Sequence, residues 1–171
     1  LRMFDREILT LYQAYNGNDS YIFAFILLFC MYLLFYGLYK NKGFEGYKKN
    51  ILDQSGSLIN DYTIDAGKYL VMINMGLNGL LAILYVKLSS GIINGPILGG
   101  IFSVIGFSAF GKHPRNIFPI MVGVYFTSLI NKYEPSSTTA ILTGLFSTTL
   151  APIAGEFGFL AGVLQVFPTK Q

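Results

Sequence analysis

Cysteine and histidine each occur only once in this sequence, and charged residues make up only 12% of it. The single cysteine, Cys30, lies inside an apolar run, which excludes a disulfide framework and a thiol cluster for a metal ion. His113 has no histidine, cysteine or carboxylate at ligand spacing, so we expect no metal site and no cofactor. So little charge beside 53% hydrophobic residues is typical of an integral membrane protein.

Long apolar runs, separated by short polar stretches, predict an all-α fold, a polytopic membrane helix bundle with about five membrane segments. The run 21–39 is free of charge and has tyrosines near both ends, which is typical of a spanning helix with an aromatic belt. We expect residues 1–19 to be a peripheral amphipathic segment, residues 20–167 to be the transmembrane domain, and residues 168–171 to be a tail. The five predicted segments are 21–39, 69–86, 92–110, 117–130 and 138–167.

The last segment, 138–167, is too long for one straight span. At about 1.5 Å per residue it would extend roughly 45 Å as a continuous helix, against a hydrocarbon core of about 30 Å. Its middle reads Ala151-Pro152-Ile153-Ala154-Gly155-Glu156-Phe157-Gly158, and we expect a break at 152–158. Either the segment crosses as a kinked helix, or it folds back at the break as a re-entrant hairpin.

Glu156 is the only acidic residue well inside an apolar segment, and an intramembrane carboxylate is costly enough to suggest function. Discontinuous helices with such a residue often build solute sites near the membrane midplane. Ser147, Thr148 and Thr149 would supply hydroxyl groups beside it. The alternatives are a glutamate that joins two helices by hydrogen bonds, and hydroxyls that bond back to their own helix.

Three asparagines lie on or beside predicted spans. Asn74 and Asn78 are one helical turn apart and therefore share a face, where they either bond neighbouring helices or line a polar path. Asn94, in Asn94-Gly95-Pro96, either begins a helix that serves packing alone or begins one whose N-terminus faces a solute. Small residues at Gly91, Gly95, Gly99 and Ser103 form a stripe that favours close helix packing.

The loop 111–116 concentrates Lys112, His113 and Arg115 ahead of a helix start, where they could contact an anion. The alternative is a topological anchor. Loops 40–68 and 111–116 together carry more Lys and Arg than the opposite side, so we expect both to be cytoplasmic in a multi-pass cell-membrane protein.

No P-loop, Ser/His/Asp signature or zincin motif occurs, so we expect no enzymatic activity, and no basic footprint predicts a nucleic-acid partner. The expected partners are the lipid bilayer and a small polar or ionic solute. Because the chain begins at Leu1 and ends soon after an apolar run, we expect it to be a piece of a longer chain, whose remainder is then a partner. A second copy in a homo-oligomer is the other expected protein partner.

Three motifs resemble those of a bacterial family of multi-spanning membrane proteins. They are Asn94-Gly95-Pro96-Ile97-Leu98-Gly99-Gly100, Gly111-Lys112-His113-Pro114-Arg115-Asn116 and Ala151-Pro152-Ile153-Ala154-Gly155-Glu156-Phe157-Gly158. The family is found mainly in Firmicutes and is catalogued as a domain of unknown function; the resemblance covers roughly residues 60–163. It implies a chain with about ten spans, of which this sequence is similar to a middle piece, and it implies no activity.

These observations favour a channel or secondary transporter module for a small polar or ionic solute, coupled to protons or cations through Glu156. A non-transporting membrane subunit or assembly protein is the main alternative. A membrane enzyme acting on lipid-linked phosphate is the third. The solute, the direction of transport and the oligomeric state are open at this point.

Overall fold

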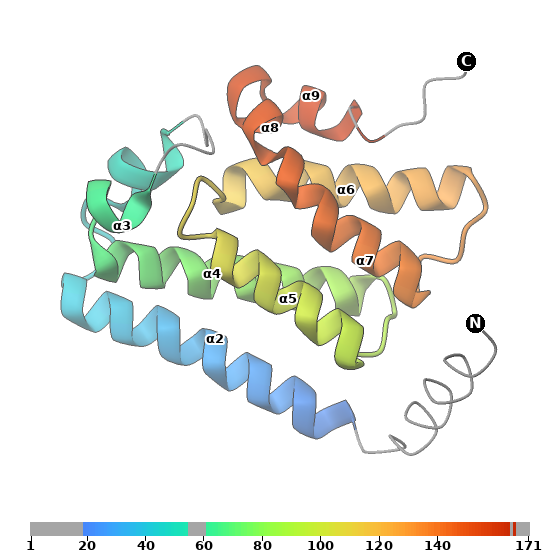
Figure 1. The fold of residues 1–171 in the computed structure, drawn as a ribbon, viewed down its shortest axis with the longest axis horizontal. Helices are drawn as coiled ribbons and strands as arrows, with labels where there is room; N and C mark the ends of the chain where they lie inside the picture. The colour runs from blue at the N-terminus through green and yellow to red at the C-terminus, as the bar shows by residue number, and fades with distance from the viewer. Residues whose placement is uncertain (1–18, 55–60, 165, 167–171) are drawn as a thin grey trace, which may run out of the picture.

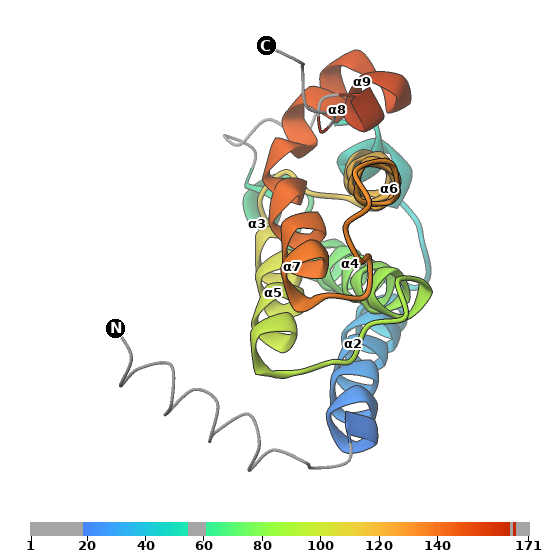
Figure 2. The same ribbon diagram turned by 90° about the vertical axis from the view of Figure 1, so that its right-hand side faces the viewer.

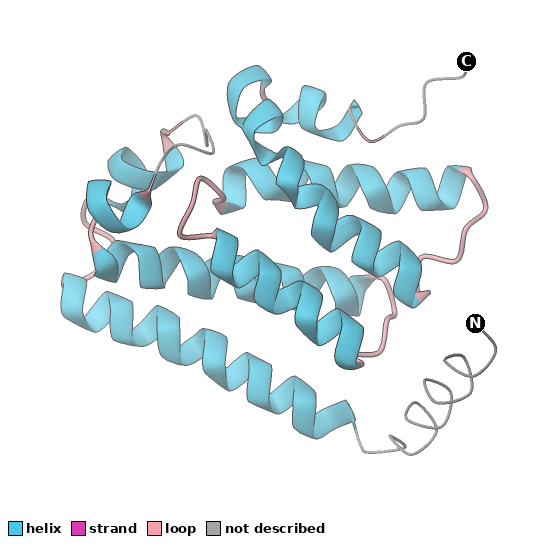
Figure 3. Cartoon of the chain, in the orientation of Figure 1, coloured by secondary structure: helices cyan, strands magenta, loops and turns pink. Residues whose placement is uncertain are grey.

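The computed structural model describes residues 19–54, 61–164 and 166, and every regular element within these ranges is a helix (Figure 3). The expectation of an all-α fold is therefore confirmed for this part of the chain. The predicted peripheral segment, apart from Asp19, and the predicted tail 168–171 lie outside the described residues.

The first two long helices, α2 (Asp19–Asn41) and α4 (Lys68–Leu88), pack side by side along most of their length (Figures 1 and 2). Glycine makes the close approach feasible. A methyl group at Gly76 would lie 2.8 Å from the backbone nitrogen of Leu34 and 2.9 Å from the carbonyl oxygen of Cys30. The two backbones are thus in contact there, and any larger side chain would separate them.

Three stretches in the described part of the chain are long and apolar enough to cross a membrane: Ser20–Asn41, Lys68–Leu88 and Thr138–Phe157. Helix α5 (Gly95–Phe107) is apolar but has only 13 residues, or about 20 Å. Helix α6 (Pro114–Ile130) has 17 residues. These features indicate a multi-pass membrane protein in which α5 is shorter than a full span.

The predicted break contains two separate features. Helix α7 (Thr138–Ser147) begins with Ser137 as its N-cap and tightens into η2 (Thr148–Leu150), directly before α8 (Ala151–Phe157). Pro152 has no N–H to continue the helical bonding, which accounts for the tightened turn that precedes it. The chain then reverses at Gly158, whose φ of 86° favours glycine, and continues as α9 (Phe159–Leu164) (Figure 1).

Helix α9 packs back against α6 and α8. A methyl group at Gly162 would lie 2.7 Å from the Cβ of Ala154 and 2.9 Å from the Cγ of Pro119. Gly123 of α6 likewise gives room to the backbone of Val163. Small residues on all three helices therefore hold the returning arm in place.

The polar stretch between α2 and α4 covers one end of the bundle. Its short elements η1 (Lys48–Leu52) and α3 (Tyr62–Asp65) insert the side chains of Ile51 and Tyr62, both fully buried, against the start of α4. The backbone N–H of Tyr62 also donates to the carbonyl of Ala109, at 3.0 Å. The two loops predicted to share one side of the membrane thus contact each other at this end.

Candidate functional site

The loop that joins α5 to α6 is held inside the bundle by side chains of α4. Asn74 Nδ2 donates to the carbonyl oxygens of Ser108, at 2.7 Å, and Lys112, at 2.6 Å. Asn74 is six residues from the start of α4, which corresponds to a depth of about 9 Å. Helix α5 therefore ends well short of the bundle end. Because α5 ends early, backbone carbonyls at its end lack helical partners, and the Asn74 amide donates hydrogen bonds to them.

Asn78, one turn further along α4, binds the same loop. Its Nδ2 donates to Ser108 Oγ at 2.7 Å and to the Lys112 carbonyl at 3.2 Å, and Ser108 Oγ donates in turn to the Val104 carbonyl. Tyr47 completes the network by donating its hydroxyl to Asn74 Oδ1 at 2.8 Å. Asn78 Oδ1 is buried and has no hydrogen-bond partner among the described residues.

Lys112 takes part in this network through its backbone carbonyl, and its side chain is buried beside it, with only 4% of the residue exposed. Its Nζ donates to Thr148 Oγ1 at 2.9 Å and lies 5.0 Å from the ring centroid of Phe107. Thr148 is fully buried and donates its own hydrogen to the Leu145 carbonyl. We call Asn74, Asn78, Ser108, Lys112 and Thr148 the polar layer.

Within the described ranges, no carboxylate forms an ion pair with Lys112, because the single ion pair found there joins Asp53 to Arg115. Burial lowers the pKa of Lys112 from 10.5 to about 8. The amine is therefore mostly charged at pH 7 but loses its proton more readily than an exposed lysine. One hydrogen bond and one aromatic face leave part of its donor capacity unused.

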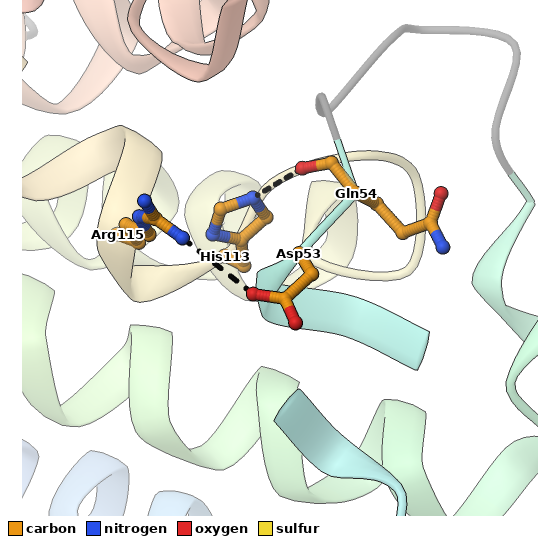
Figure 4. A network of polar contacts seen from close by, with 4 residues as sticks. All are labelled: Asp53, Gln54, His113 and Arg115. Atoms are coloured by element: carbon orange, nitrogen blue, oxygen red, sulfur yellow. Dashed lines mark hydrogen bonds and ion pairs between the residues drawn. The ribbon is translucent and has the colours of Figure 1, made fainter. Parts of the chain in front are cut away.

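A cavity of about 510 Å³ opens at the covered end of the bundle, and we call it the end cavity. Asp53 and Gln54, which follow η1, meet His113 and Arg115 at the start of α6 (Figure 4). The turn between α8 and α9 closes the other wall with Gly155, Gly158 and Phe159. Three distant parts of the sequence thus supply its lining.

Arg115 and Asp53 form an ion pair at 3.6 Å across the end cavity, and both side chains are largely exposed. His113, by contrast, is buried, and its Nε2 lies 3.2 Å from the Gln54 carbonyl oxygen (Figure 4). Burial lowers the pKa of His113 to about 4, and the positive charge of Arg115 acts in the same direction. The imidazole is accordingly neutral at physiological pH.

A second pocket of about 450 Å³ lies between α6 and α7, and we call it the hydroxyl pocket. Thr139, Thr143 and Ser147 face it from successive turns of α7, and Thr127 and Ser128 face it from α6. Thr143 and Ser128 donate to carbonyls of their own helices, so toward the pocket they offer acceptor lone pairs. Thr127 Oγ1 is buried and has no hydrogen-bond partner in the described ranges.

The structure brings together four of the residues that the sequence singled out: Asn74, Asn78, Lys112 and Thr148. His113 and Arg115 line the end cavity instead, and Ser147 lines the hydroxyl pocket. The asparagines bond to Ser108, the C-cap of the neighbouring helix α5, and to Lys112 in the loop that follows it.

The other three singled-out residues lie apart from the polar layer. Asn94 caps α5 and donates to Thr138 Oγ1 at 2.8 Å, near the opposite end of the bundle. Thr149 is exposed and bonds back to the Phe146 carbonyl. Glu156 is exposed at the C-terminal end of α8, and no described residue forms a hydrogen bond or ion pair with it.

Sequence reasoning missed Tyr47, Asp53, Gln54 and Ser108. The first three lie in a polar loop where no spacing marks them, and only the tertiary fold brings them to α4 and α6. Ser108 carried a weak signal, because it is a polar residue near the end of the apolar run that closes at Phe110, just before the Gly111-Lys112 turn. Among the described residues, no group of three or more His, Cys, Asp or Glu could hold a metal ion.

The family comparison agrees with the motifs. Residues 39–168 match the family described as "Protein of unknown function (DUF1576)", and the chain belongs to this family. No curated protein and no solved structure matches the chain.

Proposed function

We propose that this chain is a channel or secondary transporter module for a small polar or ionic solute, whose path passes the polar layer. The observation that carries the proposal is Lys112. A cation buried without a counter-charge costs folding free energy, and apolar residues of the same volume would cost less. The presence of such a residue in an apolar bundle favours a role in handling a solute.

The positions of the two pockets support the same proposal. Along the continuous stretch from α7 to α8, the hydroxyl pocket is lined by residues up to Leu150, and the end cavity is lined by residues from Ala154 onward. Thr148, which binds Lys112, is fully buried on the same stretch, two residues before Leu150, and lines neither pocket. We propose that a solute moving from one pocket to the other passes the Lys112 amine.

We further propose that α5 and α6 are embedded together with the three long apolar stretches, giving five membrane segments, and that α9 is a re-entrant arm. The cavity end, with loops 40–68 and 111–116, would face the cytoplasm. Glu156 lies near that end in an exposed position. We therefore propose Lys112 as the main residue for coupling to protons or cations, and Glu156 as the second candidate.

Thr148 and Thr149 provide a matched pair for the test. The purified chain is reconstituted into liposomes, and stopped-flow light scattering follows the entry of glycerol, L-alanine, ammonium chloride or sodium phosphate. We expect at least one solute to enter faster than into empty liposomes. Thr148→Val should slow that entry about tenfold, the equivalent of one hydrogen bond to a charged group, whereas Thr149→Val should leave it unchanged.

A non-transporting membrane subunit is the second candidate, and the outward face of α5 favours it. Methyl groups at Gly95 and Gly99 would contact nothing within 4 Å, so this face is free to pack against another helix. Liposomes that stay impermeable to all four solutes, together with a stable partner after purification in mild detergent, would favour this role. Turnover of a lipid-linked phosphate that depends on Lys112, His113 and Arg115 would instead indicate an enzyme.

A further inference from the structure

The end cavity presents a positive group and a negative group to the same space. Arg115 offers guanidinium donors, and Asp53 offers a carboxylate. Its volume of about 510 Å³ falls within the usual range for small-ligand sites. The charges of Arg115 and Asp53 balance, so the cavity favours neither a plain anion nor a plain cation.

The pairing between Arg115 and Asp53 is weak enough to open for a ligand. Their closest atoms are 3.6 Å apart, longer than a good charge-assisted hydrogen bond, and water reaches both side chains. Exposed pairs of this kind contribute little to stability. A ligand with both charges could therefore replace one long contact with two short ones.

His113 forms a buried part of the cavity wall. Its Nε2 lies 3.2 Å from the Gln54 carbonyl oxygen, and its Nδ1 is buried at the N-terminus of α6, where the ring forms a capping box with Asn116. The charged side-chain groups that a ligand in the cavity can reach are therefore those of Arg115 and Asp53.

We propose that the end cavity binds a small zwitterion in which a primary ammonium lies a few bonds from a carboxylate or phosphate. Arg115 binds the anionic oxygens, while Asp53 accepts hydrogen bonds from the ammonium. The chemistry is shared by free amino acids and by the head groups of aminophospholipids. Binding does not require transport, so the proposal stands or falls separately from the proposed function.

The test measures binding from both sources. For the free source, L-alanine is titrated calorimetrically into the purified chain in a non-ionic detergent, with acetate and methylammonium as single-charge probes. For the lipid source, native mass spectrometry compares retention of phosphatidylethanolamine with that of phosphatidylcholine, which has the phosphate but no N–H donor. Variants Asp53→Asn and Arg115→Gln each remove one half of the site, and Asp65→Asn is a matched carboxylate control at the same bundle end.

We expect L-alanine to bind, or phosphatidylethanolamine to be retained over phosphatidylcholine. Asp53→Asn and Arg115→Gln should each weaken that binding at least tenfold, while Asp65→Asn should not change it. Whether a variant binds a single-charge probe more tightly than the wild type does distinguishes a zwitterion site from a plain anion or cation site. Tighter acetate binding by Asp53→Asn with no L-alanine binding would show a plain anion site. Tighter methylammonium binding by Arg115→Gln would show a cation site. Either result, no binding of any zwitterion, or unchanged binding by both variants overturns the proposal.

Discussion

Asn74 and Asn78 supply the hydrogen-bond donors that make the early end of α5 tolerable. A helix leaves its last carbonyls unpaired, and inside a membrane protein water does not reliably satisfy them. The two side-chain amides donate to the carbonyls of Ser108 and Lys112, which come from the end of α5 and the loop after it. The spacing of the asparagines predicted a shared face, and these contacts show what that face binds.

Replacing Asn74 with leucine should strongly destabilise the chain. The substitution leaves the Ser108 carbonyl without this donor inside the bundle, at a cost of about 2–4 kcal/mol, including the loss of the Tyr47 bond. Asn131→Leu is the control, because its Nδ2 donates to the Thr127 carbonyl at an exposed site. Thermal unfolding in a mild detergent should show a clear drop in melting temperature for Asn74→Leu and almost none for Asn131→Leu. Equal effects would contradict the importance of the loop contact.

The buried amine of Lys112 should make stability depend on pH in the alkaline range. Its pKa is about 8 in the folded chain and near 10.5 when the chain unfolds, so the unfolded state binds more protons between these values. Stability should therefore rise by up to about 3 kcal/mol from pH 8 to pH 10.5, and the penalty should be constant below pH 8. The difference in unfolding free energy between the wild type and Lys112→Met, measured from pH 8 to pH 10.5, isolates the contribution of the Lys112 amine. A difference independent of pH would contradict it.

At the scale of whole helices, glycine has opposite consequences on α4 and on α5. Gly76 lies where α4 touches the backbone of α2, whereas Gly95 and Gly99 face open space. The small-residue stripe of α5 was expected to mediate packing. Gly91, the first residue of the stripe, does pack against α7, because a methyl group there would overlap Cδ1 of Ile141. Gly100, outside the stripe, also meets α7, close to Leu145. Small-residue spacing therefore predicted the close contact at Gly91, but not the open space beside Gly95 and Gly99.

Alanine substitutions at Gly76 and Gly99 should distinguish a glycine at a helix contact from a glycine that faces open space. Gly76→Ala places a methyl group 2.8 Å from the Leu34 nitrogen, and we expect a loss of about 1–3 kcal/mol in unfolding free energy. Gly99→Ala meets no neighbour and gains helix propensity, so it should be neutral or stabilising by up to about 1 kcal/mol. Thermal melting in detergent reports both. A destabilised Gly99→Ala would mean that the open face of α5 is covered by another helix.

At the scale of the molecule, the apolar runs predicted the positions of the helices, because a charged or polar stretch marks each end of every run. The run 21–39 corresponds to α2, 69–86 to α4 and 92–110 to the shorter α5. The sequence predicted a break somewhere in residues 152–158 but not its geometry, since it was compatible with either a kink at Pro152 or a reversal of the chain. Length alone could not reveal that α5 ends early, because its apolar composition continues through Phe110.

The candidate site was only partly predictable. Polar residues inside apolar segments, such as Asn74 and Thr148, are conspicuous because burying them is costly. Asp53 and Gln54 belong to a polar loop in which such residues are ordinary, so composition carried no signal for the end cavity. Glu156 illustrates the opposite case, because the apolar sequence around it suggested burial while the reversal at Gly158 leaves it exposed.

The contact between the two polar loops predicts that they share one side of the membrane. In a chain with Cys30 replaced by serine, Lys49→Cys and Lys132→Cys place single thiols at opposite ends of the bundle. A membrane-impermeant maleimide applied to spheroplasts should label the Lys132→Cys chain at once and the Lys49→Cys chain only after permeabilisation. The reverse pattern would invert the orientation, and equal labelling would contradict the bundle arrangement.

The central claim is that Lys112 serves the function of the chain at the expense of its stability. The most direct measurement compares Lys112→Met with wild type in two assays on one preparation: entry of the solute that the wild type admits into liposomes, and unfolding in detergent at pH 7. We predict that solute entry falls to the level of empty liposomes while the melting temperature stays the same or rises, because the substitution removes an uncompensated buried charge. Solute entry at the wild-type rate in a folded Lys112→Met chain would contradict the account.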